Sequence, residues 1–184
     1  CTHEGVSADS EGVLLIPDTW LTVPENAFEH CTDIKSLIIS NSVREISFRS
    51  FYYCTNLASI TFGSESSLKT ISKDAFKSCS SLTALIIPNS VETLGDYTFR
   101  STGLTSVTIG EKVTSIGHGA FMSCPLLSVT IPDAVKTIKN HAFDQCTSMT
   151  SVKIGSSVTH LGYCTFRGCT SLKSVVIPNT VTTL

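Results

Sequence analysis

The sequence predicts an α/β solenoid in which every repeat contributes one short parallel strand and returns through turns or short helical pieces. The main observation is a phenylalanine that recurs at intervals of 22 to 25 residues. Six of the seven phenylalanines are followed three positions later by cysteine, and Phe99 is followed by Thr102 instead. Self-similarity at such a period is typical of stacked-repeat proteins. The two columns are Phe28, Phe51, Phe76, Phe99, Phe121, Phe143 and Phe166, and Cys31, Cys54, Cys79, Cys124, Cys146 and Cys169.

Three further apolar columns keep the same register. Residues 87–99 and 131–143 superimpose position for position without a gap. We therefore expect one apolar core running through all repeats. The columns are Val43, Val91, Val113, Val135, Val158 and Val181; Val23, Ile46, Ile71, Leu94, Ile116, Ile138, Leu161 and Leu184; and Ile34, Leu57, Leu82, Leu104, Leu126, Met149 and Leu172.

Each repeat contains one segment in which apolar and small polar residues alternate, as in residues 172–177, and this predicts a strand with one buried face. Proline or glycine follows the segment and ends the strand, because proline lacks a backbone donor and glycine tolerates turn dihedrals. The remaining return path has no sustained helical periodicity, which favours turns and short helical or 3₁₀ pieces. The residues that end the strands are Gly63, Pro88, Gly110, Pro132, Gly155 and Pro178.

A single repeat of this size cannot bury its apolar side, so the repeats must stack. Parallel strands about 4.8 Å apart would form one elongated domain with a continuous core. We expect residues 13–184 to be this solenoid, with about seven to eight repeats and a truncated C-terminal end. Residues 1–12 fit no column, and we expect them to cover the first coil as a cap, lead-in or hairpin strand.

The repeated motif is Ala142-Phe143-x-x-Cys146-Thr-Ser-Met149-x-Ser-Val-x-Ile, kept over residues 13–184 with small changes. It resembles the cysteine-containing leucine-rich repeats of the BspA-like surface proteins of bacteria and parasitic protists. The resemblance implies a curved leucine-rich repeat arc that acts as a binding or adhesion module at a cell surface. Two repeats depart from the pattern, one with Thr102 in place of cysteine and one with a less regular strand segment at residues 34–39.

The composition is that of a folded chain, with 41% hydrophobic and 15% charged residues. A net charge of −2 with scattered lysine and arginine argues against a nucleic-acid partner, which requires a basic stripe. No run of 18 apolar residues is present, so we expect no membrane insertion in this segment. Residues 1–10 lack the basic start and apolar stretch of a signal peptide.

The eight cysteines raise the question of disulfides and metal sites. Six share one column, where each would behave as a small buried side chain, so we predict a ladder of free thiols. Cys1 and Cys164 lie outside it, and we expect each to be free or linked elsewhere. A structural zinc site usually contains a closely spaced Cys-x-x-Cys pair, which is absent. His118, His141 and Cys164 could meet on one surface, but exposed loop residues are the favoured interpretation, and we predict no metal and no cofactor.

Catalysis is not expected. A cysteine enzyme singles out one thiol and activates it with a base, whereas here six thiols occupy equivalent core positions. Motifs such as Gly-x-Ser-x-Gly and His-Glu-x-x-His are absent.

The strand residues between buried positions predict a flat, weakly charged outer surface, which we call the strand face. Such a surface suits an extended partner that makes many modest contacts, although it lacks aromatic and arginine anchors. An alternative is that these β-branched residues only satisfy strand propensity. The candidate ligand-binding residues are Ser36, Ile38, Thr61, Ile86, Thr108, Thr130, Lys153 and Val176.

Three functions remain open at this point. The first is a non-enzymatic protein-binding or adhesion module, secreted or at a cell surface, whose partner is a host, matrix or neighbouring cell-surface protein. The second is a structural spacer or self-assembling repeat unit. The third is an intracellular recognition scaffold, favoured if the cysteines are unpaired, since a reducing cytoplasm protects thiols.

Overall fold

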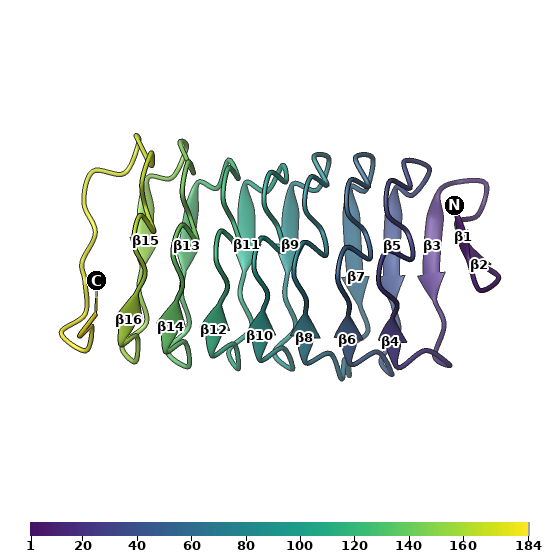
Figure 1. The fold of residues 1–184 in the computed structure, drawn as a ribbon, viewed down its shortest axis with the longest axis horizontal. Helices are drawn as coiled ribbons and strands as arrows, with labels where there is room; N and C mark the ends of the chain where they lie inside the picture. Colours follow the sequence, from purple (N-terminus) through teal and green to yellow (C-terminus); the bar gives the residue numbers. More distant parts are fainter. Residues whose placement is uncertain (184) are drawn as a thin grey trace.

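The computed structural model describes residues 1–183 as a row of stacked coils that advance along one axis from the N-terminus to the C-terminus (Figure 1). The predicted parallel-strand solenoid is confirmed. The predicted α/β class is wrong, because no helix forms among the described residues. Leu184, placed above in an apolar column, lies outside this range.

Each coil has two strands rather than the single one predicted. The first strand of each coil belongs to a column on one side of the solenoid and the second to a column of two-residue strands beside it (Figure 1). The first column consists of β3 (Val13–Ile16), β5 (Ser36–Ile39), β7 (Ser59–Phe62), β9 (Ala84–Ile86), β11 (Ser106–Thr108), β13 (Ser128–Thr130) and β15 (Ser151–Lys153). The second consists of β4 (Thr22–Val23), β6 (Glu45–Ile46), β8 (Thr70–Ile71), β10 (Thr93–Leu94), β12 (Ser115–Ile116), β14 (Thr137–Ile138) and β16 (His160–Leu161).

The two columns differ in continuity. The short strands form one parallel sheet from β4 to β16, in the order of the chain. The first column is divided into three parallel pieces, β3-β5-β7, β9-β11 and β13-β15. Residues 172–177, expected to form a further strand, form none. The first column is therefore interrupted between β7 and β9 and between β11 and β13.

The third side of each coil carries the phenylalanine turn and has its own backbone ladder. Phe51 N–H donates to Ala75 O at 2.9 Å, and Arg49 and Tyr53, two residues to either side, donate to Lys73 and Lys77. These flanking positions have positive φ in successive coils, as at Arg49 (52°) and Tyr53 (62°). A helix cannot continue through left-handed residues. The helical pieces expected here are replaced by turns in which alternate N–H groups donate to the next coil. The N–H groups between them donate within their own turn, as from Tyr52 to Arg49 O and from Cys54 to Phe51 O.

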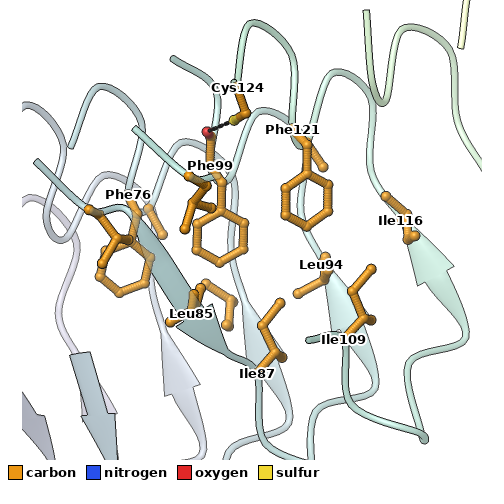
Figure 2. Close-up of a cluster of buried hydrophobic side chains, with 14 of the residues drawn as sticks. Phe76, Leu85, Ile87, Leu94, Phe99, Ile109, Ile116, Phe121 and Cys124 are labelled. Carbon is orange, nitrogen blue, oxygen red and sulfur yellow. Dashed lines mark hydrogen bonds between the residues drawn. The ribbon is translucent and has the colours of Figure 1, made fainter. Parts of the chain in front are cut away.

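The phenylalanines form the centre of the core. Neighbouring rings stack with centroids 5.2 to 5.8 Å apart and planes within 18° of parallel. Figure 2 shows Phe76, Phe99 and Phe121 in line above Leu85 of β9 and Ile109, which follows β11. All rings of the column have no accessible surface except Phe166, which is partly exposed. One continuous core therefore connects the coils.

The cysteine column has a specific role in this stack. Each of its free thiols donates to the carbonyl oxygen of the phenylalanine one coil earlier, as from Cys54 to Phe28 O at 3.0 Å. The bond from Cys124 to Phe99 O, at 3.1 Å, is drawn in Figure 2. Burial raises the pKa of Cys54 to about 12 and that of Cys124 to about 11. These thiols satisfy buried carbonyls and are held in the protonated form.

Cys31 departs from the predicted free-thiol ladder because it forms a disulfide with Cys1. Cys1 begins a small antiparallel hairpin, β1 (Thr2–His3) and β2 (Val6–Ser7), that lies beside β3 at the N-terminal end of the row (Figure 1). His3 contacts the Phe28 ring edge-on, with centroids 6.2 Å apart. The hairpin therefore covers the first coil, and the disulfide fastens it there.

We expect three classes of cysteine in a thiol-labelling experiment followed by mass spectrometry. An alkylating reagent should modify Cys164 in the native protein, because this free thiol is only partly buried. The buried free thiols should react only after unfolding, since the thiolate is the reactive form and burial disfavours it. Cys1 and Cys31 should label only after reduction. Native labelling of Cys79 or Cys146 would contradict the buried column.

Candidate functional site

The candidate site is the strand face, formed by outward side chains of the first strand column. The predicted residues Ile38, Thr61, Ile86, Thr108, Thr130, Lys153 and Val176 are exposed, whereas Ser36 is only partly exposed. Ser59 Oγ donates to Ser36 Oγ at 2.9 Å. Val176 is 83% exposed, but it lies outside any strand. The structure thus brings seven of these residues into one column and places Val176 beyond the last strand of it.

One of the two interruptions of the strand face lies where the repeat changes length. Phe51 and Phe76 are 25 residues apart, whereas all other intervals are 22 or 23 residues. The extra residues lengthen the turn after β7, at residues 63–67, and β7 and β9 belong to different sheets. Figure 1 shows a wider interval between β7 and β9 than between β5 and β7.

A pocket of about 750 Å³ lies at this interruption. Its lining includes Thr61 and Ile86 from the strand face, the long turn with Glu65, and Ser90 and Lys112 from the next two turns. Ile86 is 72% exposed, far more than Ile38 at 38% in the same column. Ile86 thus lines a recess of the strand face at the point where the repeat changes length.

A second cluster, made of aromatic and cationic side chains, lies on the phenylalanine-turn side of the coils and was not predicted from the sequence. We call it the turn-side cluster. Lys77 Nζ lies 5.3 Å from the centre of the Tyr52 ring and 5.8 Å from that of Tyr97. Tyr97 contacts His118 edge-on, with ring centroids 4.9 Å apart. The available signal was the position of these residues within three of a core phenylalanine. Such contacts each stabilise the fold by about 0.5–1 kcal/mol, so these aromatic and cationic groups are engaged with one another.

A family model described as "BspA type Leucine rich repeat region" matches residues 13–127 and 114–184, with six copies. The chain belongs to this BspA-type leucine-rich repeat family. The resemblance found in the repeat motif is therefore confirmed. A search of curated proteins gives no match.

Three solved structures are similar to this BspA-type chain. The T. pallidum leucine-rich repeat protein TpLRR is 29% identical, with a TM-score of 0.81 over 89% of this chain and 78% of that one. A leucine-rich cell surface protein from Faecalibacterium prausnitzii is 21% identical (TM-score 0.56; 94% and 68% covered). The pneumococcal vaccine antigen PcpA is 20% identical (TM-score 0.59; 92% and 51% covered). The last two share the fold, and this chain spans about half of PcpA.

The suggested metal cluster of the BspA-type chain is only partly assembled. The rings of His118 and His141 lie 5.2 Å apart, but His141 Nδ1 is hydrogen-bonded to Asp144 at 2.9 Å. Within residues 1–183, the one group of three potential ligand atoms less than 4.8 Å apart is Cys1, Cys31 and Asp33. The two sulfurs of that group are bonded to each other. Residues 1–183 also contain no helix long and apolar enough to cross a membrane.

Asp144 is the most buried carboxylate near the turn-side cluster, and its side chain has no accessible surface. Arg167 Nε donates to Asp144 Oδ1 at 3.0 Å, and a second guanidinium nitrogen donates to Oδ2. Burial alone would raise the pKa of Asp144. The hydrogen bonds from Arg167 and His141 outweigh burial and hold this pKa below its usual value.

Acidification should remove the stabilisation that ionised Asp144 provides. Because its pKa is lower in the folded chain than in the unfolded one, the contribution is complete above the unfolded value of about 3.9 and is lost as pH falls through the folded value. We expect the difference in unfolding free energy between the natural chain and Asp144→Asn to shrink from pH 5 towards pH 2. Urea titrations across that range measure it, and a constant difference would contradict the ion-pair role.

Proposed function

We propose that this BspA-type chain is a non-enzymatic protein-binding or adhesion module of a secreted or cell-surface protein, and that its partner binds across the strand face. The observation that carries the proposal is the open column of exposed side chains from Ile38 to Lys153. Repeat solenoids use such elongated surfaces to bind extended partners. The family membership and the neighbour described as a cell surface protein support the same reading.

Two observations favour this proposal over the alternatives. The disulfide between Cys1 and Cys31 favours an oxidising compartment over a cytoplasmic scaffold. The thiols of the cysteine column donate to core carbonyls and have raised pKa values, so they are unsuited to nucleophilic catalysis. A spacer or self-assembling unit remains the second candidate function, and the experiment below distinguishes it.

The test uses matched charge insertions on the two strand columns. Thr108→Glu lies in the middle of the strand face, and Thr93→Glu is the control, since Thr93 is an exposed threonine on β10 of the second column. Binding of the natural chain to an array of purified extracellular-matrix and host cell-surface proteins identifies the partner. Thr108→Glu should then weaken binding about tenfold or more, equivalent to about 1.4 kcal/mol, and Thr93→Glu should leave it unchanged.

Equal effects of the two variants would place the partner elsewhere on the molecule. Absence of any partner on the array, together with concentration-dependent self-association in sedimentation, would favour the spacer function instead.

A further inference from the structure

The pocket between β7 and β9 has a fixed wall on one side. Asn41, from the preceding coil, holds the long turn, because its side-chain oxygen accepts from Glu65 N–H at 3.2 Å and its carbonyl accepts from Ser67 N–H at 3.0 Å. A third bond, from Ser66 N–H to Gly63 O at 3.1 Å, closes the turn on itself. The wall is therefore a defined structure.

The pocket combines an apolar floor with polar groups that have no partner in the fold. Ile86 lies exposed on the floor, beside the buried side chain of Leu85. Ser90 Oγ is buried without a hydrogen-bond partner among the described residues. Glu65 and Lys112 line the pocket, and neither belongs to an ion pair within residues 1–183. Unpaired charges and an unpaired hydroxyl around an apolar patch are typical of ligand sites.

The charges are placed in order along the solenoid axis. Glu65, Ser90 and Lys112 come from the turns of three successive coils. Two coil intervals separate Glu65 from Lys112, and the first of them is wider than the usual spacing of about 4.8 Å. The two side chains are therefore more than about 10 Å apart along the axis, which suits about four to five residues of extended chain. The order of groups is therefore a carboxylate, an apolar surface and an ammonium group.

The ligand must lie on the strand face and not within the sheet. Cα atoms of β7 and β9 come within 8 Å of each other. An inserted strand would require about 9.6 Å, twice the normal strand spacing. A partner therefore has to cross over the two strands from outside.

We propose that this pocket binds an extended polypeptide segment that runs along the solenoid axis. Successive side chains of an extended chain point to opposite faces, so every second residue of the segment faces the pocket. Of these residues, the central one packs an apolar side chain on Ile86, and the two outer ones pair an acidic side chain with Lys112 and a basic side chain with Glu65. This inference rests on the proposed function in one respect, namely that the partner is a protein. It adds the sequence character of the segment that the partner presents.

The test uses the capped pentapeptide acetyl-Lys-Gly-Leu-Gly-Glu-amide and amide NMR spectra of the isotope-labelled chain. The peptide should shift the amides of Thr61, residues 63–66, Ile86 and Ser90. Acetyl-Lys-Gly-Gly-Gly-Glu-amide, which lacks the apolar side chain, should bind about tenfold more weakly. Ile86→Ser should weaken binding of the leucine peptide to the same extent. Ile38→Ser is the matched control, because Ile38 occupies the same column outside the pocket, and it should have no effect.

Lys112→Glu tests the charge order. It should weaken binding of acetyl-Lys-Gly-Leu-Gly-Glu-amide and strengthen binding of acetyl-Lys-Gly-Leu-Gly-Lys-amide relative to the natural chain. Shifts spread evenly over the surface, or equal effects of Ile86→Ser and Ile38→Ser, would overturn the pocket. If the pentapeptide fails to bind while Thr108→Glu still weakens partner binding, the pocket inference fails and the proposed function stands. If the pentapeptide binds but Thr108→Glu leaves partner binding intact, the pocket stands and the wider strand-face proposal fails.

Discussion

Replacing Phe99 by alanine should lower the unfolding free energy by about 3–5 kcal/mol. The Phe99 ring has no accessible surface and stacks between Phe76 and Phe121, at centroid distances of 5.7 and 5.4 Å. Its removal leaves a cavity bordered by three coils. The backbone ladder on this side also limits collapse, because Phe99 N–H is bonded to Ala120 O at 2.8 Å. Urea unfolding followed by circular dichroism measures the loss.

Thr108→Ala is the control for this prediction. Thr108 is exposed on β11, and its replacement should change stability by no more than about 0.5 kcal/mol. Since stacked repeats can unfold in parts, hydrogen exchange should accompany the denaturation curves. We expect the Phe99 variant to lose protection first in the coils around residues 76–121. Equal losses in the two variants would contradict the assignment of these residues to core and surface.

The repeat period predicts much of this fold because packing imposes it. Every coil meets the same neighbours, so an apolar position needed once is needed in each repeat, as the phenylalanine and cysteine columns show. The second strand column was not predicted, since strands of two residues, such as Thr93–Leu94, are too short to show alternation. Helical pieces were predicted where the chain is in fact left-handed, at Tyr97 and Ser101 among others. Neither tyrosine nor serine indicates a positive φ in a sequence.

The candidate site was predictable in position but not in shape. Alternation within strands placed Thr108 and Thr130 on the outside, where the structure has them. The longer interval before Phe76 is also visible in the sequence. This longer interval has two consequences, namely that β7 and β9 do not pair and that a recess forms at Ile86. Both depend on how neighbouring coils accommodate the longer turn. The role of the glycines that end the strands also could not be predicted from the sequence. Gly110 has no positive φ, and glycine is required there because a Cβ would lie too close to Pro88 O.

Breaking the disulfide between Cys1 and Cys31 should cost about 3–4 kcal/mol by the chain-entropy estimate for a loop of this size. The two cysteines are 30 residues apart and enclose the hairpin and the first coil. Reduction, or Cys1→Ser, should release the hairpin and expose Phe28 and Trp20, which now contact His3. Tryptophan fluorescence reports this directly, because Trp20 is the single tryptophan of the chain.

Cys164→Ser is the matched control, since Cys164 is a free, partly buried thiol outside the cysteine column. It should leave both stability and fluorescence unchanged, and identical stability of reduced and oxidised protein would contradict the prediction.

The position of Cys31 in the first coil explains why loss of the disulfide should lower stability. Later members of the column fasten their coil to the preceding one through a thiol-to-carbonyl hydrogen bond, as Cys54 does to Phe28. Residues 1–27 contain no phenylalanine whose carbonyl could accept such a bond from Cys31, and a covalent bond to the hairpin takes the place of that hydrogen bond.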